Sequence, residues 1–144
     1  MSTQMPGLPP PRLTSVSAPY WRAAGDRRLL VQRCGDCGTH RHPPTPACYA
    51  CGSLAVDWDE VAGTGRVHSF VWTHRPVVSV FENLGVYNVA VVELDGTVGE
   101  PVRILSRVND IDRDGLVVGL AVCVDFDPVD DEVALPVFVP RPLG

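Results

Sequence analysis

Two matching cysteine units decide the fold of this chain: Cys34-Gly-Asp-Cys37-Gly38 and Cys48-Tyr-Ala-Cys51-Gly52, with ten residues between Cys37 and Cys48. A Cys-x-x-Cys pair places two sulfurs on one tight turn. Two such turns facing each other supply the four thiolates that tetrahedral Zn²⁺ binds at about 2.3 Å. Each closing glycine is expected to take positive φ and let backbone N–H groups point at the sulfurs. The sequence therefore predicts one zinc site, ligated by Cys34, Cys37, Cys48 and Cys51.

Other uses of these cysteines stay open. Two disulfides would require an oxidising compartment, and a thioredoxin-like redox pair would leave the second pair without a role. Iron accepts the same ligands, because spacing alone does not choose between metals. Four thiolates fill a tetrahedral coordination sphere, which predicts a structural metal and not a catalytic one. His40 and His42 are surplus to this site and are predicted to be surface loop histidines.

Length and composition indicate a soluble globular protein. The chain has 144 residues, of which 45% are hydrophobic, enough for one domain or two small ones. Its first residues lack the basic start and apolar run of a signal peptide, and no stretch approaches a membrane span. The sequence therefore predicts a cytoplasmic protein, in a reducing compartment that keeps cysteines as metal thiolates.

Charge is unevenly distributed along the chain. Residues 1–75 carry eight arginines against five acidic residues, whereas residues 76–144 carry four arginines against twelve. The acidic half would repel a polyphosphate backbone, which argues against nucleic-acid binding. All 12 basic side chains are arginines, so Schiff-base chemistry on a lysine is excluded.

Three segments follow one another. Residues 1–13 are a proline-rich arm, residues 14–60 are predicted to form a short helix and the zinc ribbon, and residues 61–144 are predicted to form a barrel. The helix should end near Gly25, with Tyr20 and Trp21 packing on this chain or on a partner. A ribbon of about thirty residues buries too little apolar surface to offset the entropy lost on folding. The metal must therefore supply the missing free energy of folding.

The barrel is predicted from strand-like segments that are separated by turn signals and show no helical periodicity. Gly63-Thr-Gly65 opens it as a flexible pivot or bulge, and a long loop spans residues 75–85. Five strands in about eighty residues favour an OB-fold over a sandwich. The predicted strands cover residues 65–74, 86–94, 102–108, 121–126 and 133–139.

The ordered set of motifs resembles a known family. The motifs are Tyr20-Trp21, Leu30-Val-Gln-Arg-Cys34-Gly-Asp-Cys37-Gly, His42-Pro-Pro, Cys48-Tyr-Ala-Cys51-Gly-Ser53, Gly63-Thr-Gly-Arg-Val-His-Ser-Phe70, Val102-Arg-Ile-Leu-Ser-Arg-Val108 and Val118-Gly-Leu-Ala-Val122. They are similar to bacterial and archaeal acyl-CoA-associated proteins that were long called a domain of unknown function. The resemblance implies a mainly β fold, with a short N-terminal helix, a rubredoxin-like zinc ribbon and a five-stranded OB-fold barrel.

The same resemblance implies a non-catalytic subunit of a heteromeric complex, a heterotetramer or similar. Family members accompany thiolase-superfamily enzymes, including lipid-transfer-protein-like aldolases of steroid side-chain degradation, and others accompany MaoC-like enoyl-CoA hydratases. In such assemblies the ribbon and OB-fold help form the acyl-CoA site, and the catalytic residues belong to the partner.

Candidate catalytic residues are few. Cys123 alternates with valines in a strand and is predicted to be half-buried. His68 and Ser69 are adjacent in a strand, hence on opposite faces, and cannot act together as base and nucleophile. The acidic run at 125–132 is predicted to be a solvated turn. An independent thioesterase and a nucleic-acid-binding OB module remain as alternative functions.

Candidate binding residues fall into two groups. Arg66, His68, Phe70, Trp72 and His74 are predicted to share one strand face, as interface anchors or, for the aromatics, as core. The other group could contact coenzyme A or a partner, because guanidinium groups bind phosphate bidentately and OB-folds meet ligands at their loops. This group comprises Tyr20, Trp21, Arg41, Arg66, Arg75, Arg103 and, in the 75–85 loop, Phe81.

Overall fold

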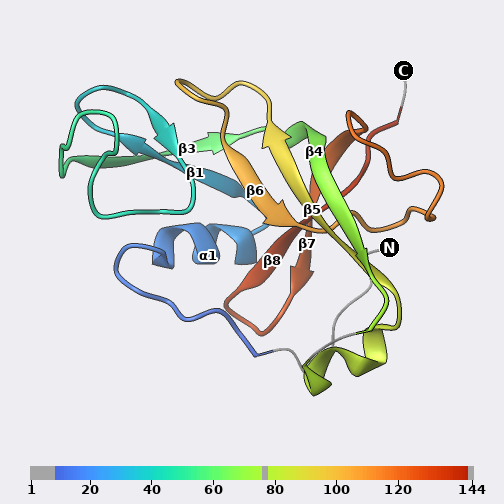
Figure 1. Cartoon of the computed structure of the whole chain (residues 1–144). Coiled ribbons are helices and arrows are strands. Elements are labelled where there is room, and N and C mark those ends of the chain that lie inside the picture. Colours follow the sequence, from blue (N-terminus) through green and yellow to red (C-terminus); the bar gives the residue numbers. More distant parts are fainter. Residues whose placement is uncertain (1–8, 76–77, 143–144) are drawn as a thin grey trace.

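A short helix and two antiparallel sheets follow one another along the chain (Figure 1). The computed structural model describes residues 9–75 and 78–142, so most of the predicted proline-rich arm lies outside the described part. Helix α1 (Ala18–Gly25) has a proline in its first turn and ends at Gly25, where the sequence predicts its end. None of the described helices is long and apolar enough to cross a membrane.

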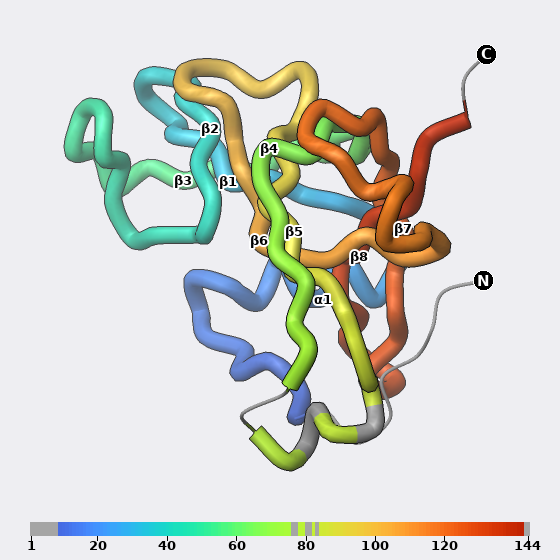
Figure 2. The backbone as a smooth tube through the Cα atoms, turned by 45° about the vertical axis from the view of Figure 1, so that its right-hand side comes forward, coloured from blue at the N-terminus to red at the C-terminus, as the bar shows by residue number. Residues whose placement is uncertain are grey.

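The first sheet is the predicted ribbon. Strand β1 (Leu29–Cys34) lies between β2 (His40–Arg41) and β3 (Val56–Val61), and both pairings are antiparallel. The first cysteine unit forms the β1–β2 turn, and the second lies in the segment between β2 and β3. Figure 2 shows this small sheet projecting from one side of the larger one.

The second sheet contains the five predicted strands. They are β4 (Thr64–Thr73), β5 (Tyr87–Leu94), β6 (Arg103–Ser106), β7 (Ala121–Pro128) and β8 (Ala134–Pro140), in the spatial order β6-β5-β4-β7-β8. The sheet curls until its two edges meet, where a parallel bridge joins Val108 to Phe138. This confirms the mainly β fold and the OB-type barrel.

One core joins the two sheets and α1. Tyr20 and Ala24 from α1, with Leu29 and Val31 from β1, are buried in the same cluster as the barrel interior. The ribbon is therefore packed on the barrel, because β1 and the helix contribute apolar side chains to the shared core. The barrel contributes Val67, Ala90, Val92, Leu94, Val102, Ile104, Val108, Leu116, Val122, Phe126, Ala134 and Phe138 to this cluster.

A β-bulge changes the orientation of half of β4. Val67 pairs with Val92, but Ser69 pairs with Val91, so His68 is an extra residue on this strand. Arg66 is exposed before the bulge, whereas Phe70 and Trp72 pack on the core after it. The prediction that these residues share one face is therefore wrong, because the extra residue reverses the alternation.

Two further sequence expectations need correction. The 75–85 loop contains a short 3₁₀ helix, η1 (Ser79–Leu84), and the side chain of Phe81 lies outside the described residues. Gly63 is not a flexible pivot. It is buried, with a φ of +80°, and a Cβ at this position would lie 2.2 Å from Cγ1 of Val124. The strand entry is therefore fixed by close packing.

Candidate metal site

The four predicted cysteines converge at the tip of the ribbon. Their sulfur atoms all lie within 4.8 Å of one another. The Sγ atoms of Cys34 and Cys51 are 3.6 Å apart, and those of Cys37 and Cys48 are 3.7 Å apart. Tetrahedral ligands at about 2.3 Å from a zinc ion would be about 3.8 Å apart, whereas bonded sulfurs would be about 2.05 Å apart. The spacing fits a metal site, and none of the four cysteines forms a disulfide in this structure.

Backbone amides support the sulfurs as the glycines predict. Gly38 and Gly52 both have a φ of +77°, and their N–H groups donate to the carbonyls of Cys34 and Cys48. These tight turns direct the N–H groups of Asp36 and Cys37 to the Cys34 sulfur at 3.4 Å. The site is thus polarised to hold negative sulfur.

The same contacts set the pKa values of the thiols. Hydrogen bonds from the Cys37 and Asp36 backbone lower the pKa of Cys34 to about 6, and the Thr39 hydroxyl lowers the pKa of Cys37. The Ser53 backbone favours the Cys51 thiolate, but hydrogen bonding with Cys34 and burial raise the pKa of Cys51 to about 12. Metal binding would require Cys51 to lose the proton that this raised pKa favours.

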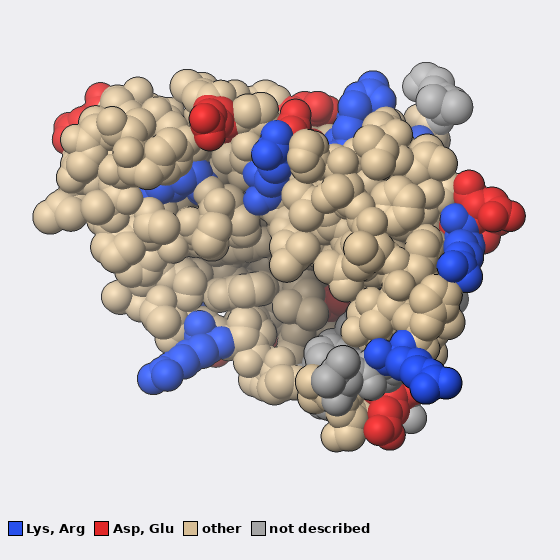
Figure 3. Space-filling model, in the orientation of Figure 1, with Lys and Arg blue, Asp and Glu red and all other residues tan. Residues whose placement is uncertain are grey.

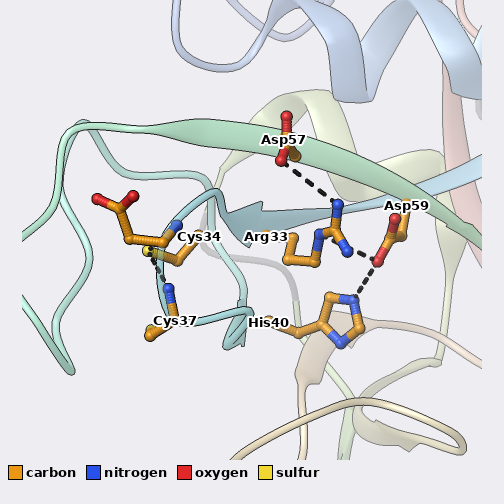
Figure 4. A network of polar contacts seen from close by, with 7 residues as sticks. Arg33, Cys34, Cys37, His40, Asp57 and Asp59 are labelled. Carbon is orange, nitrogen blue, oxygen red and sulfur yellow. Dashed lines mark hydrogen bonds and ion pairs between the residues drawn. The ribbon is translucent and has the colours of Figure 1, made fainter.

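A buried histidine, His40, ties the ribbon to the barrel, and Figure 4 shows its contact with Asp59 within the ribbon. The backbone N–H of Val98, in the β5–β6 loop, donates to Nδ1 of His40 at 2.8 Å, so the ring proton is on Nε2 and faces Asp59 at 2.8 Å. Arg33 forms ion pairs with Asp57 and Asp59 at 3.3 and 3.5 Å. We call His40, Asp59 and Val98 the ribbon tether.

The structure corrects the prediction that His40 and His42 are surface loop histidines. His40 is 5% exposed, and His42 is half-buried with its ring 5.0 Å from that of Tyr20. Burial lowers the pKa of His42 to about 4, so its ring is neutral at physiological pH. A single sequence gives no signal for the tether, because His40 and Val98 are 58 residues apart.

We expect His40→Ala to lower the free energy of unfolding by about 1–3 kcal/mol, because the variant loses the two hydrogen bonds of a buried side chain and leaves a cavity in its place. Urea denaturation with the metal present measures this. The matched control is His68→Ala, since His68 is an exposed histidine 3.9 Å from Glu93. Equal loss in both variants would show that the tether contributes no stability of its own.

The predicted arginines separate in the structure. Arg41 and Arg103 line one cavity between the ribbon and the barrel. Arg66 is exposed and donates to the carbonyl of Gly119 at 3.0 Å, and Arg75 is exposed beyond the end of β4. The structure therefore brings two of the four candidates together.

The predicted aromatic anchors also divide. Tyr20 is buried and its ring stacks on Trp21 at 4.9 Å, with Trp21 half-buried at the surface. Both rings line an apolar hollow with Leu105 and Leu135. Tyr20 thus packs on this chain, and Trp21 remains available to a partner.

Comparisons with known proteins match both parts of the chain. The rubredoxin-like zinc ribbon domain of ChsH2 matches residues 21–57, and the C-terminal OB-fold domain of ChsH2 matches residues 58–127. A chain of the Ltp2-ChsH2(DUF35) aldolase superposes with a TM-score of 0.79 at 40% identity, over 91% of this chain and 98% of that one. A DUF35 protein of unknown function from Sulfolobus solfataricus has the same fold, with a TM-score of 0.60 at 10% identity over 88% and 86% of the two chains.

Curated relatives include larger proteins. A probable enoyl-CoA hydratase alpha subunit from Thermomonospora curvata is 42% identical over 134 residues, which are 92% of this chain and 40% of that protein. The 3-oxo-4,17-pregnadiene-20-carboxyl-CoA hydratase alpha subunit of Mycobacterium tuberculosis is 31% identical over 119 residues, 81% of this chain and 36% of that protein. This chain thus spans about two fifths of their length. It belongs to the ChsH2 family, which joins a rubredoxin-like zinc ribbon to a C-terminal OB-fold domain.

Proposed function

We propose that this chain is a non-catalytic, zinc-binding subunit of an acyl-CoA-processing complex, and that its catalytic partner is a lipid-transfer-protein-like aldolase. The observation that carries this proposal is the 40% identity to a chain of the Ltp2-ChsH2(DUF35) aldolase over 98% of that chain. The relative from Mycobacterium tuberculosis is named for a CoA thioester of a steroid carboxylic acid. Breakdown of steroid side chains is therefore the pathway class that we propose.

Zinc is the metal that we propose for the ribbon. Four thiolates at tetrahedral spacing suit Zn²⁺, and the family model that matches this segment is a zinc ribbon. The metal would hold the two turns together and leave no coordination position for a substrate. We also propose residues 14–60 and 61–144 as the two structural units.

An apolar surface on the outside of the barrel supports docking of a partner. After the bulge in β4, Val71 points outward and pairs with Val89, and Val91 pairs with Leu105 on β6. Val71 is 60% exposed and Leu105 is 70% exposed. We call Val71, Val89, Val91 and Leu105 the valine face. Contiguous exposed apolar side chains of this kind are typical of protein interfaces.

The valine face continues into the apolar hollow beside α1. Val89 and Leu105 line this hollow together with Trp21, and its volume is about 340 Å³. Figure 3 shows a hollow near the middle of this view, surrounded mainly by uncharged surface, with most charged residues toward the margin. Arg107, which forms an ion pair with Asp127, also lines the apolar hollow. An uncharged centre inside a charged rim is the usual anatomy of a protein interface. We propose that the catalytic subunit covers the valine face and Trp21.

Affinity capture tests the proposed assembly. The tagged chain, shown to be folded and loaded with zinc, is recovered from its native cells at moderate salt, and bound proteins are identified by mass spectrometry. We expect a lipid-transfer-protein-like protein in fixed ratio. The purified pair should cleave a steroid side-chain acyl-CoA by retro-aldol reaction, and neither protein alone should do so. Cleavage by the isolated chain would contradict the proposal.

We expect Leu105→Asp to weaken capture of the catalytic subunit at least about tenfold, because a carboxylate would be desolvated in an apolar interface. The measurement is the affinity of the two purified subunits. Val118→Asp is the matched control, since Val118 is 67% exposed in the loop before β7 and outside the valine face. Loss of affinity in the control alone would place the interface elsewhere.

A hydratase partner is the second candidate. It is favoured by the 42% identity to the probable enoyl-CoA hydratase alpha subunit. The same capture distinguishes the two, because a MaoC-like protein would then be recovered in fixed ratio. Addition of water to an α,β-unsaturated acyl-CoA would replace retro-aldol cleavage as the activity of the purified pair.

A further inference from the structure

Arg41 is a buried cation without a balancing carboxylate in the described part of the chain. It is 3% exposed, and its Nε donates to the side-chain oxygen of Gln32 at 2.7 Å. One terminal nitrogen donates to the carbonyl of Thr45 at 3.3 Å, and the other has no partner among residues 9–75 and 78–142. A guanidinium group stays charged when buried, and an uncompensated buried charge is strongly destabilising. An anion near Arg41 would remove this cost.

The cavity beside Arg41 is where such an anion can enter. It has a volume of about 170 Å³ and lies between the ribbon and the barrel. His42 and Tyr49 line it from the ribbon, and Glu100 and Arg103 line it from the β5–β6 connection and β6. We call it the seam cavity.

Arg103 supplies a second guanidinium to the seam cavity. Its Nε donates to Glu93 at 3.1 Å, which orients the side chain along the surface of β5 and β6. The two terminal nitrogens have no hydrogen-bond partner within the described residues, so they are available to a ligand. Arg41 is held by the ribbon and Arg103 by the barrel. A ligand between them would therefore bridge the two parts of the fold.

We propose that the seam cavity binds a phosphate group through Arg41 and Arg103. Two guanidinium groups that line one cavity, one from the ribbon and one from the barrel, match the charge and the several oxygens of a phosphate, and charge-assisted hydrogen bonds of this type are strong. Among the described residues that line the cavity, Glu100 is the one carboxylate. It disfavours the accumulation of further negative charge at the rim.

Tyr49 indicates which phosphate source fits better. It is 62% exposed and lines the same cavity, so its ring offers an aromatic surface to a purine attached to the phosphate. An adenosine phosphate uses both the two arginines and this ring, whereas inorganic phosphate uses the arginines alone. Identifying the nucleotide as coenzyme A rests on the proposed function, but the phosphate site does not.

Isothermal titration of the metal-loaded full chain in phosphate-free buffer tests the site. The probes are inorganic phosphate, adenosine 3′,5′-bisphosphate and adenosine. We expect the bisphosphate to bind and adenosine not to bind, with Arg41→Gln and Arg103→Gln each weakening binding about tenfold or more. Arg113→Gln is the control, because Arg113 contacts His74 and does not line the seam cavity. Equal affinity for both phosphates would identify free phosphate as the source.

Failure of the phosphate site is distinguishable from misfolding. Metal content and amide exchange of each variant are measured first, and Arg103→Gln alters no residue of the ribbon interior. Arg41 could instead serve only to balance the negative charge of the thiolate cluster. In that case Arg41→Gln releases the metal, and phosphate does not bind the unaltered chain. That result overturns the proposal. Binding that is unchanged in both variants also overturns it. Subunit capture is a separate measurement, so either result can stand without the other.

Discussion

Replacing Cys34 with serine is expected to abolish stoichiometric metal binding and unfold the ribbon. Cys34 is 1% exposed and its sulfur receives two backbone N–H groups, so the variant loses a ligand that the turn is built around. Structural zinc contributes about 10–16 kcal/mol to small domains, comparable to or larger than the roughly 5–15 kcal/mol that stabilises a whole domain. Elemental analysis of the purified protein measures the metal, and amide exchange of β1–β3 measures the ribbon.

The matched control for this prediction is Cys123→Ser. Cys123 is half-buried in β7, as its alternation with valines predicts, and it lies outside the metal cluster. We expect this variant to keep its metal and the protection of the ribbon amides. Retention of both by Cys34→Ser would disprove the metal site, and loss of both in Cys123→Ser would indicate a general folding defect.

Unfolding of the ribbon should extend into the barrel. Leu29 and Val31 of β1 are buried in the barrel cluster, and His40 bonds to the β5–β6 loop. Chelation of the metal from the folded chain should therefore lower the protection of barrel amides as well. Since the proposed phosphate site needs both parts, chelation should also abolish phosphate binding.

Gly63→Ala is expected to destabilise the chain by about 2–5 kcal/mol, from left-handed backbone strain and overpacking together. An added Cβ would lie 2.2 Å from Cγ1 and 2.9 Å from Cβ of Val124. Valine is stiff at χ1 and its backbone N–H is bonded to the Gly63 carbonyl at 2.8 Å, so Val124 has little freedom to move aside. Urea denaturation with the metal present measures the loss.

Gly96→Ala separates the two contributions. Gly96 also has positive φ, +74°, but no atom lies within 4 Å of a Cβ placed there. The free energy of unfolding of this variant should fall only by the cost of left-handed backbone strain, about 1–2 kcal/mol. If the two variants are equally destabilised, the close approach of Gly63 to Val124 does not limit the fold.

Local patterns in the sequence were enough to predict the ribbon and most of the strands. The Cys-x-x-Cys-Gly units predict their own geometry, because two sulfurs three residues apart and a glycine with positive φ are contained in one turn. A run of apolar and mostly β-branched residues from Val89 to Val92, followed by the turn signal Asp95-Gly96, likewise predicts β5. These features depend on neighbours in the chain and not on distant contacts.

The bulge in β4 shows where local pattern fails. Arg66, Phe70 and Trp72 are two residues or a multiple of two apart, so simple alternation predicts that they lie on one face of the strand. Because His68 is an extra residue, Arg66 lies on one face, and Phe70 and Trp72 lie on the other. Nothing in a single sequence marks this insertion, because a bulge is defined by the register of the partner strand β5. The same register turns Val71 outward and so creates the valine face.

The sequence by itself determined the cysteine site, the short helix and the mainly β order of elements, since each is encoded within a few consecutive residues. Tertiary structure alone decided which side chains meet across the two sheets. Val98 bonds to His40, 58 residues away, and Arg103 of the barrel faces the cavity that Arg41 of the ribbon lines. Such contacts depend on how the ribbon docks on the barrel, and that docking is set by packing of the shared core and not by any local pattern.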